Sequence, residues 1–585
     1  MTALRNNAVR TALLVTAATF LAMPAYAGKT DMQTLNVAPS KKAESAPTKA
    51  DYKTLENAGL YVSASEGSLG KYLWKDIKRS SLLPLLEDMP VESREPAVQR
   101  LIFGALLTQA DSTMINNDIA PEHGRDLLTL RLEKLTQAGA YKQAQDLYSS
   151  LDDDIEPYHE RLAQAGILAM MLNAEKSLAC VEAETVRDTF AESKFIKEVL
   201  ALCDIAMSEN PSQESRDMFA ALNLRNADVI TSKDAALTYD PKTFDALPLI
   251  EKAFLTAQNK IRFENSGVTD FAAIPPTHLR ILLTADDLSA ESRFLLTAAA
   301  EDWGLAQPGE LLSLYKAAVA PASGQDPGTM NVPDSIKDWE KLGYYFVIAS
   351  NAPDKAAEWD AIKKGFAAGN RYGIGALKPY AEVLVKAEPG DARQDELETA
   401  IRILNATATP IPPQWRSRIL GIQPSDEKDL SNQRLFALQT AVELAQNSGQ
   451  KQPQNTEKAS QLPYPANSRG GYLVKSIIEN VDTTPANSDN AVRIYEKDYG
   501  LTFKQDYVMP STVVWNHLLE ASLSKNTGET VLLSASVLQA AELGDIYPGL
   551  LNDVRTGLRN VGLTDISSDI AASAVLGSIQ TTKEN

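Results

Sequence analysis

Histidine is scarce in this chain of 585 residues, and its scarcity restricts the chemistry available. The four histidines are His123, His159, His278 and His517, and no two of them are four residues apart. The His-Glu-x-x-His helix of zinc proteases is therefore excluded. A Ser-His-Asp triad would have to be assembled from distant segments. We expect each histidine to be a surface or interhelical residue.

Other sequence motifs of reactive sites are also incomplete. The Gly-rich run 369–375 lacks a preceding strand and a following Gly-Lys-Ser/Thr, so it reads as a helix-to-helix connection and not a phosphate loop. Ser68-x-x-Lys71 lacks the elements that accompany it in acyl-serine enzymes. Asp152–Asp154 and Asp286–Asp287 read as solvated loops. The Gly-Leu-Met-Gln signature that follows the Glu-Ser pair of soluble lytic transglycosylases is absent. We predict no catalytic, cofactor-binding or metal-binding residues and no cofactor.

Positive charge is also in deficit. Lys and Arg total 57 against 76 Asp and Glu, which gives a formal net charge of −19. Such a chain should be repelled by nucleic acid and by anionic membrane surfaces. We therefore expect protein partners and no nucleic acid.

Strand signals and aromatic residues are few, at 7% aromatic, with one short extended segment predicted at 499–514. Amphipathic helical spacing is instead repeated along the chain. Its clearest examples are Leu128, Leu132, Leu135 and Ala138; Leu162, Ala165, Ala169 and Leu172; and Phe195, Val199, Leu202 and Ala206. The sequence predicts an all-α fold.

Long hydrophobic runs are absent except near the start. Residues 1–27 combine Arg5 and Arg10, an apolar stretch from Thr11 to Met23, and Ala25-Tyr26-Ala27 as a small-x-small cleavage pattern. This predicts a cleaved signal peptide and a periplasmic protein without stable membrane insertion. An uncleaved anchor is the alternative, but the stretch is shorter than the roughly 20 residues that span a bilayer.

Cysteine is limited to Cys180 and Cys203, both in helix-patterned segments 23 residues apart. Thiols pair in an oxidising compartment, and this spacing suits adjacent antiparallel helices. We predict a disulfide worth about 3 kcal/mol. Two buried free thiols are the alternative, while a redox-active pair is disfavoured because there is no Cys-x-x-Cys.

One junction suggests a repeat. Gly139, Tyr141 and Ala144 form a Gly-x-Tyr-x-x-Ala helix–turn–helix connection similar to that of tetratricopeptide repeats. Residues 173–178 occupy the equivalent place about 34 residues later, which is the tetratricopeptide period. We predict an α-solenoid of antiparallel helix pairs, degenerate in sequence. An irregular helical bundle is the alternative.

Breaks in the pattern suggest regional boundaries. We predict a signal peptide at 1–27, a disordered leader at 28–52, and helical regions at 53–319, 335–445 and 472–578. Linkers are predicted at 320–334 and 446–471, and a tail at 579–585. Whether the helical regions form one solenoid or several domains stays open.

A wider resemblance rests on three segments: the two cysteine helices, Ile274–Leu279, and Glu291–Glu301 followed by Gly304 to Tyr315. Together they look like poorly characterised exported helical-repeat proteins of alphaproteobacteria, some with automatic names of the antifreeze-glycopeptide type. The resemblance supports the fold and compartment and implies no catalytic residues. No regular Thr repeat is present to support ice binding.

These features favour a periplasmic binding or scaffold protein in a cell-envelope process, since stacked helix pairs offer a long concave surface. The alternatives are a cell-wall enzyme with a site assembled across repeats, and a structural or stress-related protein without a defined ligand. Trp339, Tyr344, Tyr345 and Trp515 are candidate partner-binding aromatics, or else core residues.

Overall fold

The computed structural model describes residues 55–120, 125–151, 159–208, 210–319, 326–423, 430–446, 469–479, 510–539 and 541–578. The predicted signal peptide, leader and tail, and most of the predicted linker at 446–471, lie outside these ranges. So do His123 and Asp152–Asp154.

The described residues are mostly helical, as predicted. The first half contains α3 (Arg79–Asp88), α4 (Pro96–Leu107), α5 (Leu127–Gln137), α6 (Tyr141–Ser149), α7 (Glu160–Leu172), α8 (Lys176–Thr185), α9 (Lys194–Met207), α10 (Gln213–Ala221), α11 (Ala227–Thr231), α12 (Pro241–Asp245), α13 (Leu249–Ala257), α14 (Pro276–Leu283), α15 (Ala290–Asp302) and α16 (Glu310–Ala318). The second half contains α17 (Asp338–Asn351), α18 (Lys355–Gly369), α19 (Gly373–Leu377), α20 (Ala381–Leu384), α21 (Gln394–Ala406), α22 (Pro413–Leu420), α23 (Leu430–Gln446), α25 (Arg469–Glu479), α27 (Thr512–Leu523), α28 (Thr527–Leu538), α29 (Pro548–Asn560) and α30 (Thr564–Ser578). Two short strands, β1 (Leu237–Thr238) and β2 (Ile261–Arg262), pair in parallel.

Many helices end in the same way, with a left-handed residue followed by a backbone hydrogen bond back to the preceding turn. Gly139 has φ +77°, and Ala140 N donates to Leu135 O at 2.9 Å. Ala174 has φ +60°, and Glu175 N donates to Met170 O at 2.8 Å. This is a Schellman-type helix end, which satisfies carbonyls that the helix leaves free. The two junctions compared in the sequence therefore share a backbone geometry, although only one has glycine.

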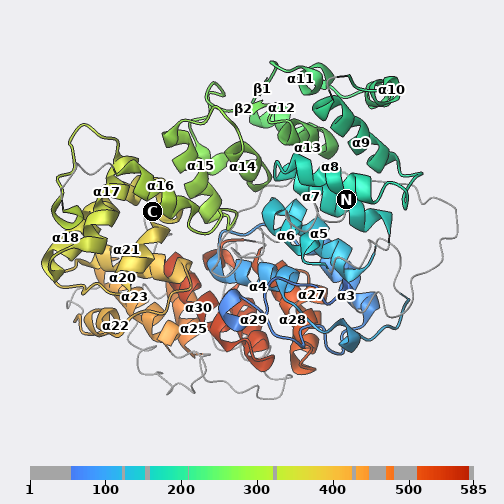
Figure 1. The fold of residues 1–585 in the computed structure, drawn as a ribbon. Coiled ribbons are helices and arrows are strands. Elements are labelled where there is room, and N and C mark those ends of the chain that lie inside the picture. Colours follow the sequence, from blue (N-terminus) through green and yellow to red (C-terminus); the bar gives the residue numbers. More distant parts are fainter. Residues whose placement is uncertain are drawn as a thin grey trace.

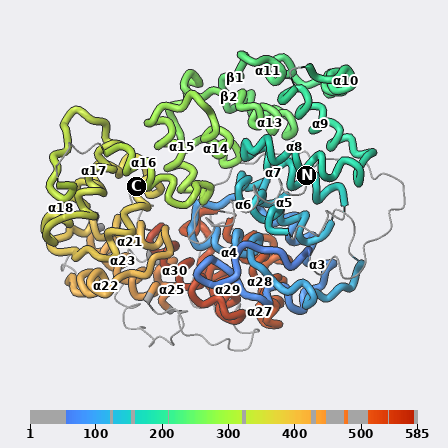
Figure 2. The backbone as a smooth tube through the Cα atoms, viewed as in Figure 1, coloured from blue at the N-terminus to red at the C-terminus, as the bar shows by residue number. Residues whose placement is uncertain are grey.

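The last helices pack against the first. α28 contacts α3 and α4, and α30 contacts α4, α23 and α25. Figures 1 and 2 show the result, with the helices following a curved path that brings the C-terminal helices beside α3 and α4. An ion pair of 2.5 Å between Arg100 and Asp569 joins α4 to α30. The chain closes on itself, so the helical regions are not laid end to end.

A single hydrophobic core runs through all three predicted helical regions, from Leu55 to Leu576. The part of the predicted linker that the structure describes, 326–334, packs against the helices. Gly328 lies so close to α17 that an added Cβ would be 2.1 Å from Asn351 O. This segment is packed onto a helix because its glycine permits the close approach.

The turn between α5 and α6 does more than join two helices. Tyr141, almost fully buried, donates a hydrogen bond of 2.7 Å to Thr277 O at the start of α14. The turn at Gly139 also meets that segment, where an added Cβ would be 2.7 Å from Pro276 O. The glycine and tyrosine thus connect the α5–α6 hairpin to α14, far along the chain.

Candidate docking groove

The candidate site is formed by three consecutive helices, α8, α9 and α10. Ser193 begins α9 by accepting a hydrogen bond of 3.2 Å from Ile196 N through its side chain, and Ser212 begins α10 in the same way through Ser215 N at 3.0 Å. Val199 and Leu202 are buried and hold α9 against the rest of the protein. Capping and burial together fix where this helix starts and which face it turns inward.

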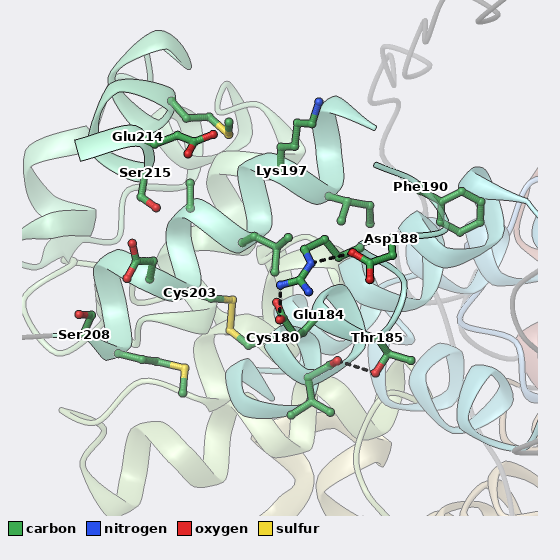
Figure 3. Close-up of a pocket in the computed structure, with 18 of the residues that line it drawn as sticks. Cys180, Glu184, Thr185, Asp188, Phe190, Lys197, Cys203, Ser208, Glu214 and Ser215 are labelled. Carbon is green, nitrogen blue, oxygen red and sulfur yellow. Dashed lines mark hydrogen bonds and ion pairs between the residues drawn. A yellow bond between two sulfur atoms is a disulfide. The ribbon is translucent and has the colours of Figure 1, made fainter. Parts of the chain in front are cut away.

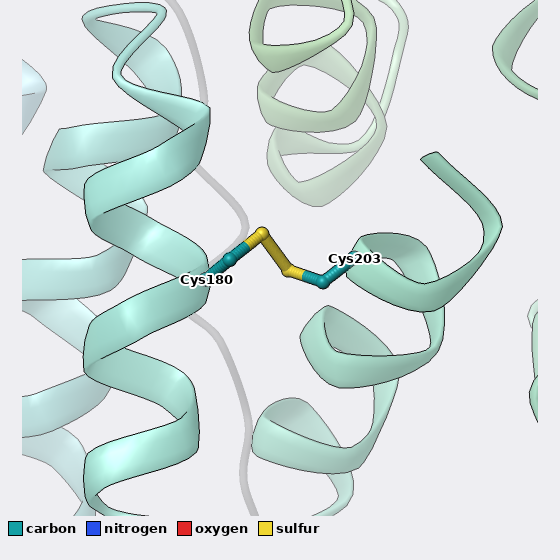
Figure 4. Close-up of a disulfide and its surroundings, with 2 residues drawn as sticks. All are labelled: Cys180 and Cys203. Atoms are coloured by element: carbon teal, nitrogen blue, oxygen red, sulfur yellow. A yellow bond between two sulfur atoms is a disulfide. The ribbon is translucent and has the colours of Figure 1, made fainter. Parts of the chain in front are cut away.

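A disulfide joins Cys180 on α8 to Cys203 on α9, which confirms the predicted pairing. The Cα atoms of the two cysteines are 5.8 Å apart. Figure 4 shows the bond bridging the two helices across the space between them. Because the cross-link holds α8 and α9 at a fixed separation, the surface between them is preformed.

That surface is a groove of about 1260 Å³ that reaches from α8 over α9 to α10 (Figure 3). Its lining includes the disulfide and a set of apolar side chains. These are Val181, Phe190, Ala191, Ile196, Leu200, Ala201, Met207 and Met218.

Two large apolar side chains of the groove are exposed. Val181 is 53% exposed and Met207 is 62% exposed, whereas large hydrophobic residues elsewhere in the described chain are mostly buried. Solvent-exposed apolar groups that gather in a concave surface are typical of interaction sites. Methionine is also well suited to binding because its flexible thioether adapts to different partner shapes.

Polar groups edge the groove. Arg187 forms ion pairs with Glu184 and Asp188. Asp204 accepts a hydrogen bond of 2.9 Å from Ser212 N, and bonds from Ser215 and Ser212 lower the pKa of its carboxyl. Asp204 therefore stays negatively charged at neutral pH. The arrangement can bind an apolar surface bordered by charge.

This site was not predicted from the sequence, although the sequence of α9 contains a signal for it. Leu200, Cys203 and Met207 recur at i, i+3 and i+7, and all three line the groove. They form a second apolar stripe on α9, beside Ile196, Val199 and Leu202, which are buried in the core. A helix with two apolar stripes has more apolar surface than one interface can cover.

The aromatic candidates lie elsewhere. Trp339 and Tyr344 are buried at 7% and 8% exposure, which is the core alternative that the sequence left open. Trp339 packs 5.5 Å from the ring of Phe294. Tyr345 is partly exposed on the same helix, α17. None of these three lines the groove.

Trp515 is partly exposed on α27, far along the chain from the groove helices. Its indole Nε1 donates a hydrogen bond of 2.8 Å to Asp553, and its ring meets Tyr547 edge-on. Burial raises the pKa of Asp553 to about 6, although the bond from Trp515 opposes the shift. Trp515 is therefore engaged within the protein.

The described histidines are also accounted for. His159 caps α7, and His278 is fully buried with its Nδ1 3.0 Å from the hydroxyl of Tyr239. His517 is exposed on α27. Within the described ranges, no three His, Cys, Asp or Glu side chains come together as a metal site, and no helix is long and apolar enough to cross a membrane.

The weaker motifs have structural explanations. The run 369–375 connects α18 to α19, as expected. Asp287 accepts backbone hydrogen bonds from Phe263 and Glu264, so it fixes a turn. Ser68 accepts a hydrogen bond from Gly70 N within a local turn.

Comparisons with family models, with curated proteins and with solved structures give no match. The resemblance to exported helical-repeat proteins therefore stays a prediction from the sequence. The groove over α8, α9 and α10 is the candidate functional site.

Proposed function

We propose that this protein is a periplasmic helical scaffold that binds a segment of another cell-envelope protein in the groove over α8, α9 and α10. The observation that carries the proposal is the exposure of Val181 and Met207 in a concave surface that a disulfide holds in shape. A preformed apolar groove lowers the entropic cost of binding, because the receptor does not have to be ordered by its partner.

The proposed compartment rests on two further observations. The first 27 residues have the pattern of a cleaved export signal. The disulfide between Cys180 and Cys203 is a bond that persists in oxidising compartments such as the bacterial periplasm.

The test is site-specific photo-crosslinking in cells. A photoreactive amino acid is placed at Met207, and cross-linked species are identified by mass spectrometry. Val513 is the matched control, because it has the same exposure of 62% but lies on α27 outside the groove. We expect a discrete protein cross-linked from Met207 and not from Val513.

The captured protein is then purified and its affinity measured. Val181→Asp and Met207→Asp each place a charge on the apolar surface and should weaken binding by tenfold or more, on the order of 1.4 kcal/mol. Val513→Asp should leave the affinity unchanged. Identical cross-linking from both positions, or equal affinity of the groove variants and the wild type, would contradict the proposal.

A further inference from the structure

The groove lies in a strongly acidic part of an acidic chain. Between Glu175 and Asp217 there are ten carboxylates and five Lys or Arg side chains. The groove lining itself contains four carboxylates, Glu184, Asp188, Asp204 and Glu214, and two cations, Arg187 and Lys197. Both sets carry an excess of negative charge, so the field at the groove favours a cationic partner.

The negative charge lies at the edge of the groove. The side chain of Asp188 is 90% exposed. Its ion-pair partner, Arg187, also pairs with Glu184, so one cation faces two carboxylates. Glu214 is exposed and forms no ion pair with any cation among the described residues. Figure 3 shows Asp188 and Glu214 on either side of the α9 surface. A ligand lying on α9 would therefore be flanked by carboxylates.

The second apolar stripe of α9, the seam, determines the length and form of the ligand. It consists of Leu200, Cys203 and Met207 and extends over two turns, or about 11 Å at 1.5 Å per residue. The seam belongs to helices, and the only strands in the described chain are the two-residue β1 and β2. Strand addition has no sheet edge here, whereas helix-in-groove binding uses anchors at i, i+3, i+4 and i+7.

From these observations we infer that the groove accepts a basic amphipathic helix of another protein, with an apolar face at least two turns long. Its apolar face lies on the seam and the disulfide, between Val181 and Met207. Its Lys or Arg side chains face Asp188 and Glu214. This inference rests on the proposed binding function and specifies the chemistry of the partner.

Synthetic peptides test the inference directly on the purified, disulfide-bonded protein. The probe is an amphipathic Leu/Lys peptide of about 18 residues, or five turns, with leucines at helical spacing. One comparison peptide replaces each Lys with Glu, and another scrambles the order so that the apolar stripe is lost. Binding is measured by fluorescence anisotropy at about 0.15 M salt, where long-range attraction is screened.

We expect the Leu/Lys helix to bind and the Leu/Glu helix not to bind. The scrambled peptide should bind at least about tenfold more weakly, because it keeps the charge but not the apolar face. Equal binding of the scrambled peptide would reduce the interaction to general attraction by an acidic protein and would overturn the inference.

Protein variants locate the binding. Val181→Ser with Met207→Ser should weaken the Leu/Lys peptide by about tenfold, while Val513→Ser should not. Asp188→Asn with Glu214→Gln should weaken it and reduce its salt dependence. The charge-matched control is Asp76→Asn with Asp391→Asn, two side chains 81% exposed outside the groove. Equal effects of both pairs of charge changes would contradict a role for the groove carboxylates.

The cross-linking experiment separates this inference from the proposed function. A partner captured from Met207 through an acidic or uncharged segment would leave the binding function standing and overturn the inferred chemistry. Capture through a basic helical segment supports both. Failure to capture any partner from Met207 counts against the binding function itself.

Discussion

Asp126 and His159 are the buried N-cap residues of α5 and α7, and their side chains are hydrogen-bonded to each other with 2.8 Å between Oδ2 and Nε2. Asp126 also accepts from Thr129 N, and His159 Nδ1 accepts from Leu162 N. Since Nδ1 is an acceptor, the Nε2 proton is the one donated to Asp126. Burial opposes the charge on Asp126, but bonds from His159 and Thr129 outweigh it and lower the pKa of the carboxyl.

This linked pair of caps predicts a large effect of a single substitution. Asp126→Ala removes one cap and the charged acceptor 2.8 Å from the buried His159 Nε2, which keeps the longer contact of 3.3 Å to Thr129 Oγ1. The free energy of unfolding should fall by about 3 kcal/mol, the sum of a lost cap and a lost hydrogen bond to a buried charged group. Urea denaturation measures it. Ser511→Ala, which removes the exposed cap of α27, should cost only about 1 kcal/mol. Equal losses would show that the two caps act separately.

The disulfide predicts a redox-dependent stability. Replacing both Cys180 and Cys203 with serine should lower the free energy of unfolding by about 3 kcal/mol, because the unfolded chain loses a cross-link across 23 residues. A reductant should lower the melting temperature of the wild type to that of the double variant. The double variant should itself be insensitive to reductant, and a response from it would place the redox effect elsewhere.

The sequence predicted the helical stripes because burial on one face leaves a direct periodic signal. Leu128, Leu132 and Leu135 are all fully buried, as their spacing indicated. The cysteine pairing was predictable because only two cysteines exist. The closure of α28 and α30 onto α4 was not, since pairing between distant helices depends on complementary surfaces and not on local spacing. The groove was missed because the Leu200–Met207 stripe reads like another core-facing surface.

The left-handed helix ends show a second limit on what the sequence alone can predict. Gly139 was recognisable as a turn, but Ala174 takes the same backbone conformation without glycine. A pattern search that requires glycine therefore finds one junction clearly and the other weakly. The left-handed conformation at Ala174 costs on the order of 1 kcal/mol, and the surrounding packing offsets this cost.

That cost is testable. Ala174→Gly should raise the free energy of unfolding by about 0.5 kcal/mol, because relief of the left-handed strain exceeds the added entropy of the unfolded chain. Thermal and urea denaturation give the sign. A loss of stability would show that packing of the Ala174 methyl group stabilises the protein by more than the left-handed backbone strain destabilises it.

Two glycines separate backbone strain from close packing. Gly139 and Gly562 both have positive φ, at +77° and +88°. An added Cβ at Gly139 would lie 2.7 Å from Pro276 O, whereas one at Gly562 would meet nothing within 4 Å. Gly562→Ala should cost about 1 kcal/mol from strain alone, and Gly139→Ala about 3 kcal/mol. Equal costs for the two variants would show that α14 shifts away from the α5–α6 turn at little cost in free energy.

The buried His278 predicts a pH dependence. Burial, followed by the charge of Lys252, lowers the pKa of His278 to about 3 in the folded protein, from 6.5 in the unfolded chain. Protons therefore bind the unfolded state preferentially, and the stability is complete above pH 6.5 and is lost as the pH falls toward 3. Between pH 7 and pH 5 this residue should lower the free energy of unfolding by about 2 kcal/mol.

His278→Phe, which keeps a ring beside Phe244 and Tyr239, should reduce the difference in free energy of unfolding between pH 7 and pH 5 by that amount. Other titrating groups are common to both proteins and cancel in the comparison. An unchanged difference in the variant would mean that the acid sensitivity arises from other groups.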